Sequence, residues 1–254
     1  MAESNNLLEI IDDHANRGEP IAVVRILYPG SGNTVSVRVS GDEISPAIAD
    51  RKLTAGILGA LERLATRGGV ADLIDVVDEE GSAVRLAVEI IKPKLELIVF
   101  GAGHVGQAVA MIGALLGYRV TAVDDREEFA SRKRLPDPSI ELLVSDYANA
   151  IEKLTISPST AVVIVTRGHQ YDELCLKNVI SSNAGYIGMI GSRRRVVSVF
   201  KKLAGEGISE AAFQRVHAPI GLRIGAKSPQ EIAVAILAEI IDQVNNPEHK
   251  HNSS

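Results

Sequence analysis

The residue types best suited to chemistry lie in a short glycine-rich segment, FGAGHVGQ. Its three glycines have the G-x-G-x-x-G spacing and directly follow the apolar run Leu97–Phe100. In dinucleotide-binding βαβ units the first glycine allows the tight turn, the second lets a pyrophosphate approach the backbone, and the third lets the next helix pack closely. The N–H groups at that helix start face the phosphates. The predicted cofactor-binding residues of this turn are Gly101, Gly103, His104, Val105 and Gly106.

An acidic residue follows at the distance where such a site contacts a ribose. The pattern predicts a helix over 104–116 and a second strand over 118–123, which is followed by Asp124, 21 residues beyond Gly103. A carboxylate there can accept hydrogen bonds from ribose hydroxyls. Its charge opposes a 2′-phosphate, whereas Arg126 could attract one, so the sequence leaves NAD and NADP open. The predicted cofactor-binding residues here are Asp124, Asp125 and Arg126.

Strands and helices alternate along the next part of the chain. Strands are predicted over 140–144, 161–166 and 185–190, and helices over 149–154 and 172–181. This alternation predicts a Rossmann-like α/β fold with a doubly wound parallel sheet, in which ligands bind beyond the carboxyl ends of the strands. Polar groups follow several of the predicted strands: Ser145 and Asp146, Thr166 to His169, and Gly191 to Arg195.

The segment GMIGSRRR combines several groups that bind anions. It ends a predicted strand at Gly191 and begins a helix at Ser192, so free N–H groups, a hydroxyl and guanidinium groups come together. Arginine at a helix N-terminus opposes the helix dipole, which favours a functional reason. An ordinary N-cap followed by a solvated first turn explains the segment equally well. The remaining predicted cofactor-binding residues are Thr166, Gly191, Ser192 and Arg193.

Candidates for catalysis are few. His169 lies three residues before Asp172, just past a predicted strand. Such a pair could be a general base with its orienting acid or two metal ligands, and capping explains it as well. Whether the chain is an enzyme therefore stays open. Two ligands do not make a metal site and Cys175 is the sole cysteine, so no metal site is predicted. The leucines around Cys175 indicate a buried core thiol.

The first ninety residues follow a different pattern, with the turn signals PGSGN and DEEGS between paired strands. They predict a small α+β domain over 1–92, followed by the Rossmann-like domain over 93–254. Its helices are predicted over 6–15 and 53–66, and its strands over 21–27, 34–39, 71–77 and 83–91.

Near the C-terminus, the glycine-rich loop Pro219–Gly225 leads to a helix with a clear start signal. Ser228 as N-cap, Pro229 as first helical residue and Glu231 as third form a capping box. The loop contains two glycines and a proline among apolar residues. Glycine costs conformational entropy, so this composition indicates that the loop requires a particular backbone conformation.

Composition excludes some partners. The formal net charge of −5, the absence of tryptophan and an aromatic content of 4% argue against a nucleic-acid surface. No apolar run has the length of a membrane span, and the N-terminus lacks the features of a signal peptide, so a cytoplasmic protein is expected. The strand edges of the small domain leave room for a homodimer.

Four segments together resemble the XdhC/CoxI family of accessory proteins for molybdenum hydroxylases: FGAGHVG, VDDREEFA, GYIGMIGSRRR and PIGLRIGAKSPQEIAVAILAEI. The resemblance covers roughly residues 95–241. It implies that the chain helps mature xanthine dehydrogenase or carbon monoxide dehydrogenase by binding the molybdenum cofactor, as molybdopterin or its dinucleotide form. It also implies assistance in sulfuration and insertion, with the hydroxylase apoenzyme and a cysteine desulfurase as partners.

The chain departs from the family pattern at two places. Longer members carry a cysteine in the N-terminal domain, whereas residues 1–91 contain none, and Arg223 stands where an acidic residue is expected. Two alternatives use the same Rossmann site. One is an NAD(P)-dependent oxidoreductase with His169 as acid/base, and the other is a nucleotide-sensing regulator.

Overall fold

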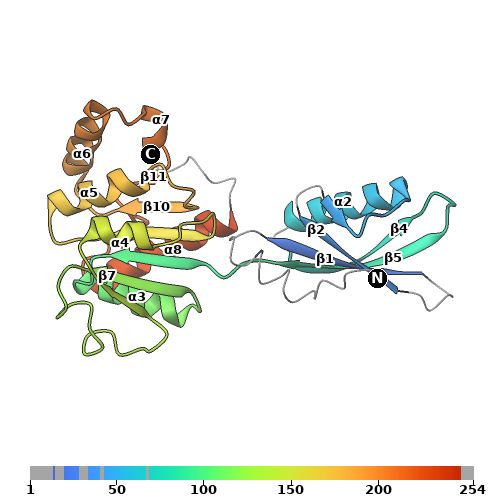
Figure 1. The fold of residues 1–254 in the computed structure, drawn as a ribbon, viewed down its shortest axis with the longest axis horizontal. Coiled ribbons are helices and arrows are strands. Elements are labelled where there is room, and N and C mark those ends of the chain that lie inside the picture. Colours follow the sequence, from blue (N-terminus) through green and yellow to red (C-terminus); the bar gives the residue numbers. More distant parts are fainter. Residues whose placement is uncertain (1–13, 15–19, 29–33, 41–42, 67–68, 247–254) are drawn as a thin grey trace. The chain divides into compact units, whose positions relative to one another are not determined.

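The computed structural model describes residues 14, 20–28, 34–40, 43–66 and 69–246, and the chain divides into two compact units, 1–93 and 94–254 (Figure 1). The helix predicted over 6–15 lies outside the described residues except for His14, and so does the PGSGN turn. Among the described helices, none combines the length and apolar character that a membrane crossing needs.

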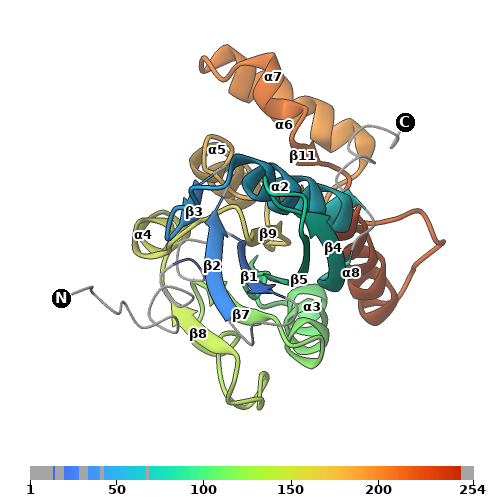
Figure 2. The same ribbon diagram turned by 90° about the vertical axis from the view of Figure 1, so that its right-hand side faces the viewer.

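The smaller unit is the predicted α+β domain. Its antiparallel sheet has the order β3-β2-β1-β5-β4, and α2 lies across one face of the sheet (Figure 2). Alternate residues of β5, such as Leu86, face the buried side chains of α2, such as Ile57. The sequence did not predict the short strand β3. The elements are β1 (Ile21–Leu27), β2 (Thr34–Ser40), β3 (Glu43–Ser45), α2 (Arg51–Thr66), β4 (Ala71–Val77) and β5 (Ala83–Ile91).

The larger unit is the predicted doubly wound domain. Its six strands are parallel and have the order β11-β10-β9-β6-β7-β8. The strands are β6 (Glu96–Phe100), β7 (Arg119–Asp124), β8 (Glu141–Val144), β9 (Thr160–Ile164), β10 (Tyr186–Met189) and β11 (Val216–His217). The helices are α3 (His104–Leu115), α4 (Tyr147–Lys153), α5 (His169–Val179), α6 (Arg193–Gly205), α7 (Glu210–Phe213) and α8 (Pro229–Asn245).

Helices cover both faces of this sheet (Figure 1). Leu97 and Val99 of β6 pack in the cluster that includes α3 and α8, whereas Ile98 and Phe100 pack in the cluster with α4, α5 and α6. Burial on both faces explains why β6 is a continuous apolar run. The strand order reverses between β6 and β9, and such a switch point is where doubly wound sheets bind ligands.

Candidate functional site

The carboxyl edge of the parallel sheet gathers the segments that the sequence singled out. Because parallel strands end at one edge, the glycine turn after β6 lies beside the residues that follow β7 and β9. Gly101 donates its N–H to the carbonyl of Val123 at 2.8 Å, and Val165 donates its N–H to the carbonyl of Phe100 at 2.9 Å. The segments at or just after the strand ends are 101–106, 124–126, 145–147, 166–168 and 191–195, with Asp124 as the last residue of β7.

Two glycines of the turn are required by the fold itself. Gly101 has φ +102°, and a Cβ there would lie 2.5 Å from the carbonyl oxygen of Val165. A Cβ on Gly106 would lie 1.7 Å from the carbonyl oxygen of Gly101. The predicted roles of these two glycines, a tight turn and close helix packing, are thus what the geometry shows.

Gly103 is different, because the protein does not need a glycine there. Its φ of −69° and ψ of −171° suit any residue, and an added Cβ would meet no described atom within 4 Å. Gly103 is the N-cap of α3, and no described side chain caps that helix. The first backbone N–H groups of α3 therefore have no intrahelical acceptor. They lie next to Gly103, which has no side chain to fill the space, and a phosphate site requires both features. His104 and Val105 begin the helix there, and His104 is exposed.

The carboxylate of Asp124 accepts hydrogen bonds from other groups of the protein. Its side chain is fully buried, with Oδ1 accepting from the backbone N–H and Nε of Arg126, and Oδ2 accepting from the backbone N–H of Ala102 and from Nη2 of Arg126. Burial raises the pKa of Asp124, but the hydrogen bonds from Arg126 and Ala102 outweigh it and hold the pKa below 3.8. The acid that the sequence assigns to a ribose thus links the glycine turn to Arg126.

The neighbouring side chains form a charged and aromatic surface. Asp125 accepts a hydrogen bond from Arg167 at 2.7 Å through Oδ2, whereas its buried Oδ1 has no hydrogen-bond partner among the described residues. The Tyr147 hydroxyl is buried and likewise has no such partner within the described part. Burial, with the charges of Asp124 and Asp125, raises the pKa of Tyr147. Sequence reasoning missed Tyr147, which directly follows Asp146. Arg167 lies within the polar range 166–169 that the sequence indicated, but it was not among the predicted site residues.

Asp172 of α5 is buried and connects that helix to Thr166, which follows β9, and to Arg195 of α6. Its Oδ1 accepts hydrogen bonds from the backbone N–H and hydroxyl of Thr166, and its Oδ2 accepts one from Arg195. The side chain of His169 lies outside the described part, so the predicted catalytic pair stays a prediction. Thr166 is brought beside the glycine turn, since a Cβ on Gly101 would lie 2.8 Å from its Cα.

In the predicted anion segment, Ser192 is an N-cap, because its hydroxyl accepts from the N–H of Arg195 at 3.3 Å. Arg193 is exposed and Gly191 half-buried, while Arg195 is the arginine that turns inward to Asp172. The sequence left two roles open for Ser192, an N-cap and an anion ligand. The geometry shows that its hydroxyl is the N-cap of α6.

Cys175 is fully buried, and burial raises the pKa of its thiol. Within the described ranges, no three His, Cys, Asp or Glu side chains are grouped as a metal ion would need.

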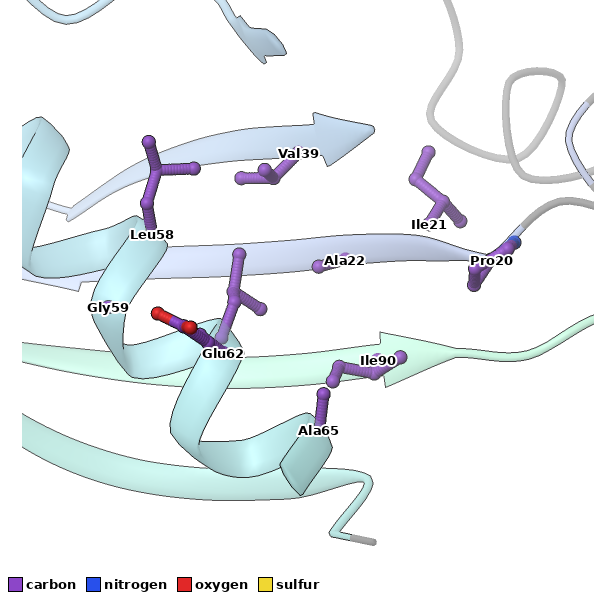
Figure 3. Close-up of a pocket in the computed structure, with 10 residues that line it drawn as sticks. Pro20, Ile21, Ala22, Val39, Leu58, Gly59, Glu62, Ala65 and Ile90 are labelled. Atoms are coloured by element: carbon purple, nitrogen blue, oxygen red, sulfur yellow. The ribbon is translucent and has the colours of Figure 1, made fainter. Parts of the chain in front are cut away.

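A separate groove of about 560 Å³ lies on the smaller unit, between α2 and the sheet (Figure 3). Its lining is mostly apolar, and Glu62 is the one charged side chain among the described residues that line it. These described lining residues include none of the site residues predicted from the sequence. The lining residues are Pro20, Ile21, Ala22, Val39, Leu58, Gly59, Leu61, Glu62, Ala65 and Ile90.

A buried carboxylate holds the glycine-rich loop before α8. Glu239 Oε2 accepts hydrogen bonds from the Tyr186 hydroxyl at 2.5 Å and the Gly221 N–H at 2.9 Å, and its Oε1 lies 3.6 Å from Nδ1 of His217. Gly221 has φ +97°, so the loop needs a glycine there. Burial raises the pKa of Glu239, but the interactions with His217, Tyr186 and Gly221 together lower it below 4.5.

We expect Glu239→Gln to lower the free energy of unfolding by about 2 kcal/mol at pH 7, because hydrogen bonds to a buried charge are lost. A lowered folded-state pKa means that the carboxylate contributes its stability fully above pH 4.5 and loses it as the pH falls through the folded-state pKa. The difference between wild type and variant should therefore shrink in urea titrations below pH 4.5. The control is Glu206→Gln, which removes a surface pair with Lys177 and should cost much less stability than Glu239→Gln. A loss independent of pH would contradict this account.

Comparison with known proteins places the chain in a family. Residues 97–240 match the family described as the XdhC Rossmann domain. "Uncharacterized protein YqeB" of Escherichia coli (strain K12) is 32% identical over 244 residues, covering 89% of this chain and 44% of that protein. A Bacillus subtilis (strain 168) protein named as a probable xanthine dehydrogenase subunit is 32% identical over 154 residues, covering 61% of this chain and 44% of that protein. The match thus spans less than half the length of each relative.

A crystal structure described as a xanthine dehydrogenase from Bacillus halodurans has a TM-score of 0.55 and 16% identity to this chain, with 97% of both chains covered. At that identity the likeness shows the fold alone. The match of residues 97–240 confirms the resemblance found in the sequence motifs, and the chain belongs to the XdhC family.

Proposed function

We propose that the chain is an accessory factor for a molybdenum hydroxylase and that its glycine turn binds the phosphate-bearing molybdenum cofactor. The family and a relative whose name links it to xanthine dehydrogenase support the connection to such an enzyme. The observation that carries the binding site is Gly103, a glycine that the fold does not require, at an uncapped helix N-terminus. A bound phosphate explains both features, because its oxygens accept from the free N–H groups and need the space of a side chain.

Molybdopterin and its dinucleotide form both carry phosphate, so the turn fits either form of the cofactor. In this proposal the cofactor is cargo, and the chain's residues bind and orient it. Sulfuration and insertion then depend on partners, namely a cysteine desulfurase and the hydroxylase apoenzyme. The burial of Cys175 fits this division, because a buried thiol with a raised pKa is a poor sulfur carrier.

Gly103→Val tests the proposal, because a branched side chain would fill the phosphate position without straining the backbone. We expect protein from a cofactor-producing host to contain near-stoichiometric pterin and molybdenum, and the variant to lose at least about tenfold. The variant should lose less than about 1 kcal/mol of stability, since only an N-cap changes. The measurements are pterin fluorescence after oxidative release and metal analysis.

Gly205→Val is the matched control, because a Cβ there also meets no described atom within 4 Å. Gly205 ends α6, whereas the start of that helix lies at the carboxyl edge, so pterin content should not change. A wild-type chain without pterin that binds NAD(H) or NADP(H) tightly would contradict the proposal and favour an oxidoreductase or a nucleotide sensor.

A further inference from the structure

The helix α6 is strongly cationic, although the chain as a whole is acidic. The helix contains five basic side chains and no acidic one, whereas the formal net charge of the chain is −5. Positive charge gathered on one element of an acidic protein attracts negatively charged partners to that element. The five basic residues are Arg193, Arg194, Arg195, Lys201 and Lys202.

Two of these five cations are already paired with carboxylates. Arg195 turns inward to the buried side chain of Asp172, and Lys202 pairs with Glu173 of α5. Both pairs join α6 to α5 within the larger unit. Their charges are therefore compensated, and a partner of α6 has to be recognised by the other cations.

The other three cations of α6 are uncompensated. Arg193, Arg194 and Lys201 are exposed, and none of their side chains makes an ion pair or hydrogen bond with another described residue. The acidic residue that follows the helix, Glu206, pairs with Lys177. The exposed side of α6 thus keeps a net positive charge after the acids around it are counted.

The uncompensated cations share the exposed face of α6 with an apolar side chain. Arg194 and Lys201 are seven residues apart, which is about two turns and about 10 Å along the helix axis. Val197 and Ser198 lie between them, and Val197 is 65% exposed. This face therefore presents two positive charges with a small apolar surface between them. The buried residues of the opposite face are Val196, Val199 and Leu203.

A hollow of about 420 Å³ borders this face. Arg194 and Ser198 line it from α6, and Glu173 lines it from α5. A carboxylate side chain that entered the hollow would meet the guanidinium of Arg194 and the hydroxyl of Ser198, and both groups can donate hydrogen bonds. The remaining lining residues are Ser192, Arg195, Val199 and Lys202.

The cationic face begins at the edge of the sheet where the ligand is proposed to bind. β10 ends at Met189 and α6 begins at Arg193, so the first turn of α6 lies at the carboxyl edge of the parallel strands. Figure 1 shows α6 beside α5 at the periphery of the larger unit. A protein that docked on α6 would thus have the carboxyl edge of the sheet next to it.

We infer that the exposed face of α6 docks an acidic segment of a partner protein, in which Arg194 and Lys201 pair with two carboxylates about 10 Å apart and Val197 makes the apolar contact between them. The charge of the face selects an acidic occupant. The exposed Val197 favours a protein over a nucleic acid, whose phosphate backbone offers only charge. The inference rests on the proposed function in one respect, namely that this partner receives or modifies the bound cofactor.

A fluorescein-labelled helical peptide with Glu at positions i and i+7 and Leu at i+3 tests the inference, because its carboxylates match the spacing on α6. Fluorescence anisotropy with the full chain should show saturable binding that weakens as salt is added. The same peptide with Gln in place of both Glu residues should bind about fivefold more weakly. Arg194→Gln combined with Lys201→Gln should weaken the Glu peptide by a similar factor and leave the Gln peptide unaffected.

Lys52→Gln combined with Arg63→Gln is the matched control. Both residues are exposed on α2 and lie about three turns apart on one face, so the change of net charge is the same. This variant should keep the wild-type affinity. Equal affinity for the two peptides, equal losses in the two variants, or no binding by the wild type would overturn the inference. Tighter binding of double-stranded DNA than of the Glu peptide would overturn the assignment to a protein partner.

Pterin content separates this inference from the proposed function. The variant with Arg194 and Lys201 replaced should keep the pterin content of the wild type, because neither residue belongs to the glycine turn. Loss of pterin together with loss of peptide binding would overturn the inference, since the two cations would then serve the cofactor. Peptide binding through these two residues by a chain without pterin would support the inference and contradict the proposed function.

Discussion

Gly106→Ala should lower the free energy of unfolding of the larger unit by about 3 kcal/mol or more, because the new methyl group overlaps the backbone. Its Cβ would lie 1.7 Å from the carbonyl oxygen of Gly101 and 3.3 Å from a methyl group of Val165. Either α3 moves away from β6 or the turn opens, and both changes disturb the phosphate position. Urea unfolding followed by circular dichroism, together with pterin content, measures the two consequences.

Gly103→Ala provides the contrast within the same turn. Its Cβ meets no described atom within 4 Å and its backbone suits any residue, so stability should fall by less than about 1 kcal/mol. Ligand binding should still weaken, because the methyl group occupies the space left for the phosphate. Equal losses of stability in the two variants would contradict the separation of a structural glycine from a ligand-facing one.

Asp124→Asn should cost about 3 kcal/mol at pH 7, because it removes the charge from a buried carboxylate that holds Arg126 and the Ala102 N–H. The Arg126 side chain is partly exposed, so we expect a loss of stability near the lower end of the range observed when one partner of a buried ion pair is removed. Because the folded-state pKa of Asp124 is lowered, this contribution is present in full above pH 3.8 and disappears as the pH falls through the folded-state pKa. The loss should thus be constant between pH 5 and 8 in thermal or urea unfolding.

Asp137→Asn is the control for that experiment. Asp137 is half-buried at the surface and accepts hydrogen bonds from Ser139, and hydrogen bonding lowers its pKa as well. Its replacement should change stability much less than Asp124→Asn does, since solvent replaces the lost contacts. A loss at Asp124 no larger than at Asp137 would show that the Asp124–Arg126 pair does not hold the turn.

The boundaries of the elements show where local signals were sufficient. The strands β1, β4 and β5 begin and end where the apolar alternation predicts, and α8 begins with the predicted capping box. Three helices begin earlier than predicted, and one of them, α2, begins at Arg51 instead of residue 53. Asp146 caps α4, so the helix begins at Tyr147, and α5 begins at His169, directly after Gly168. A capping aspartate was visible in the sequence, whereas the glycine cap of α5 gives no side-chain signal.

The sequence by itself determined the order of strands and helices apart from β3, α7 and β11, the doubly wound class of the larger unit and the position of the glycine turn. These follow from short-range patterns, because burial on both faces demands continuous apolar strands and a phosphate turn demands glycines at fixed spacing. The family also followed from motifs in the chain, and the match of residues 97–240 confirmed it.

Only the tertiary structure decided which polar groups are free. Asp124 has the spacing of a ribose acceptor, yet its capacity is taken by Arg126 and Ala102, the latter 22 residues away. Glu239 meets Tyr186 across 53 residues, and Asp172 meets Arg195 across 23. The spacing of residues along the chain determines the position of a side chain on its strand or helix. The hydrogen bonds of that side chain depend on neighbours that folding brings from distant parts of the chain.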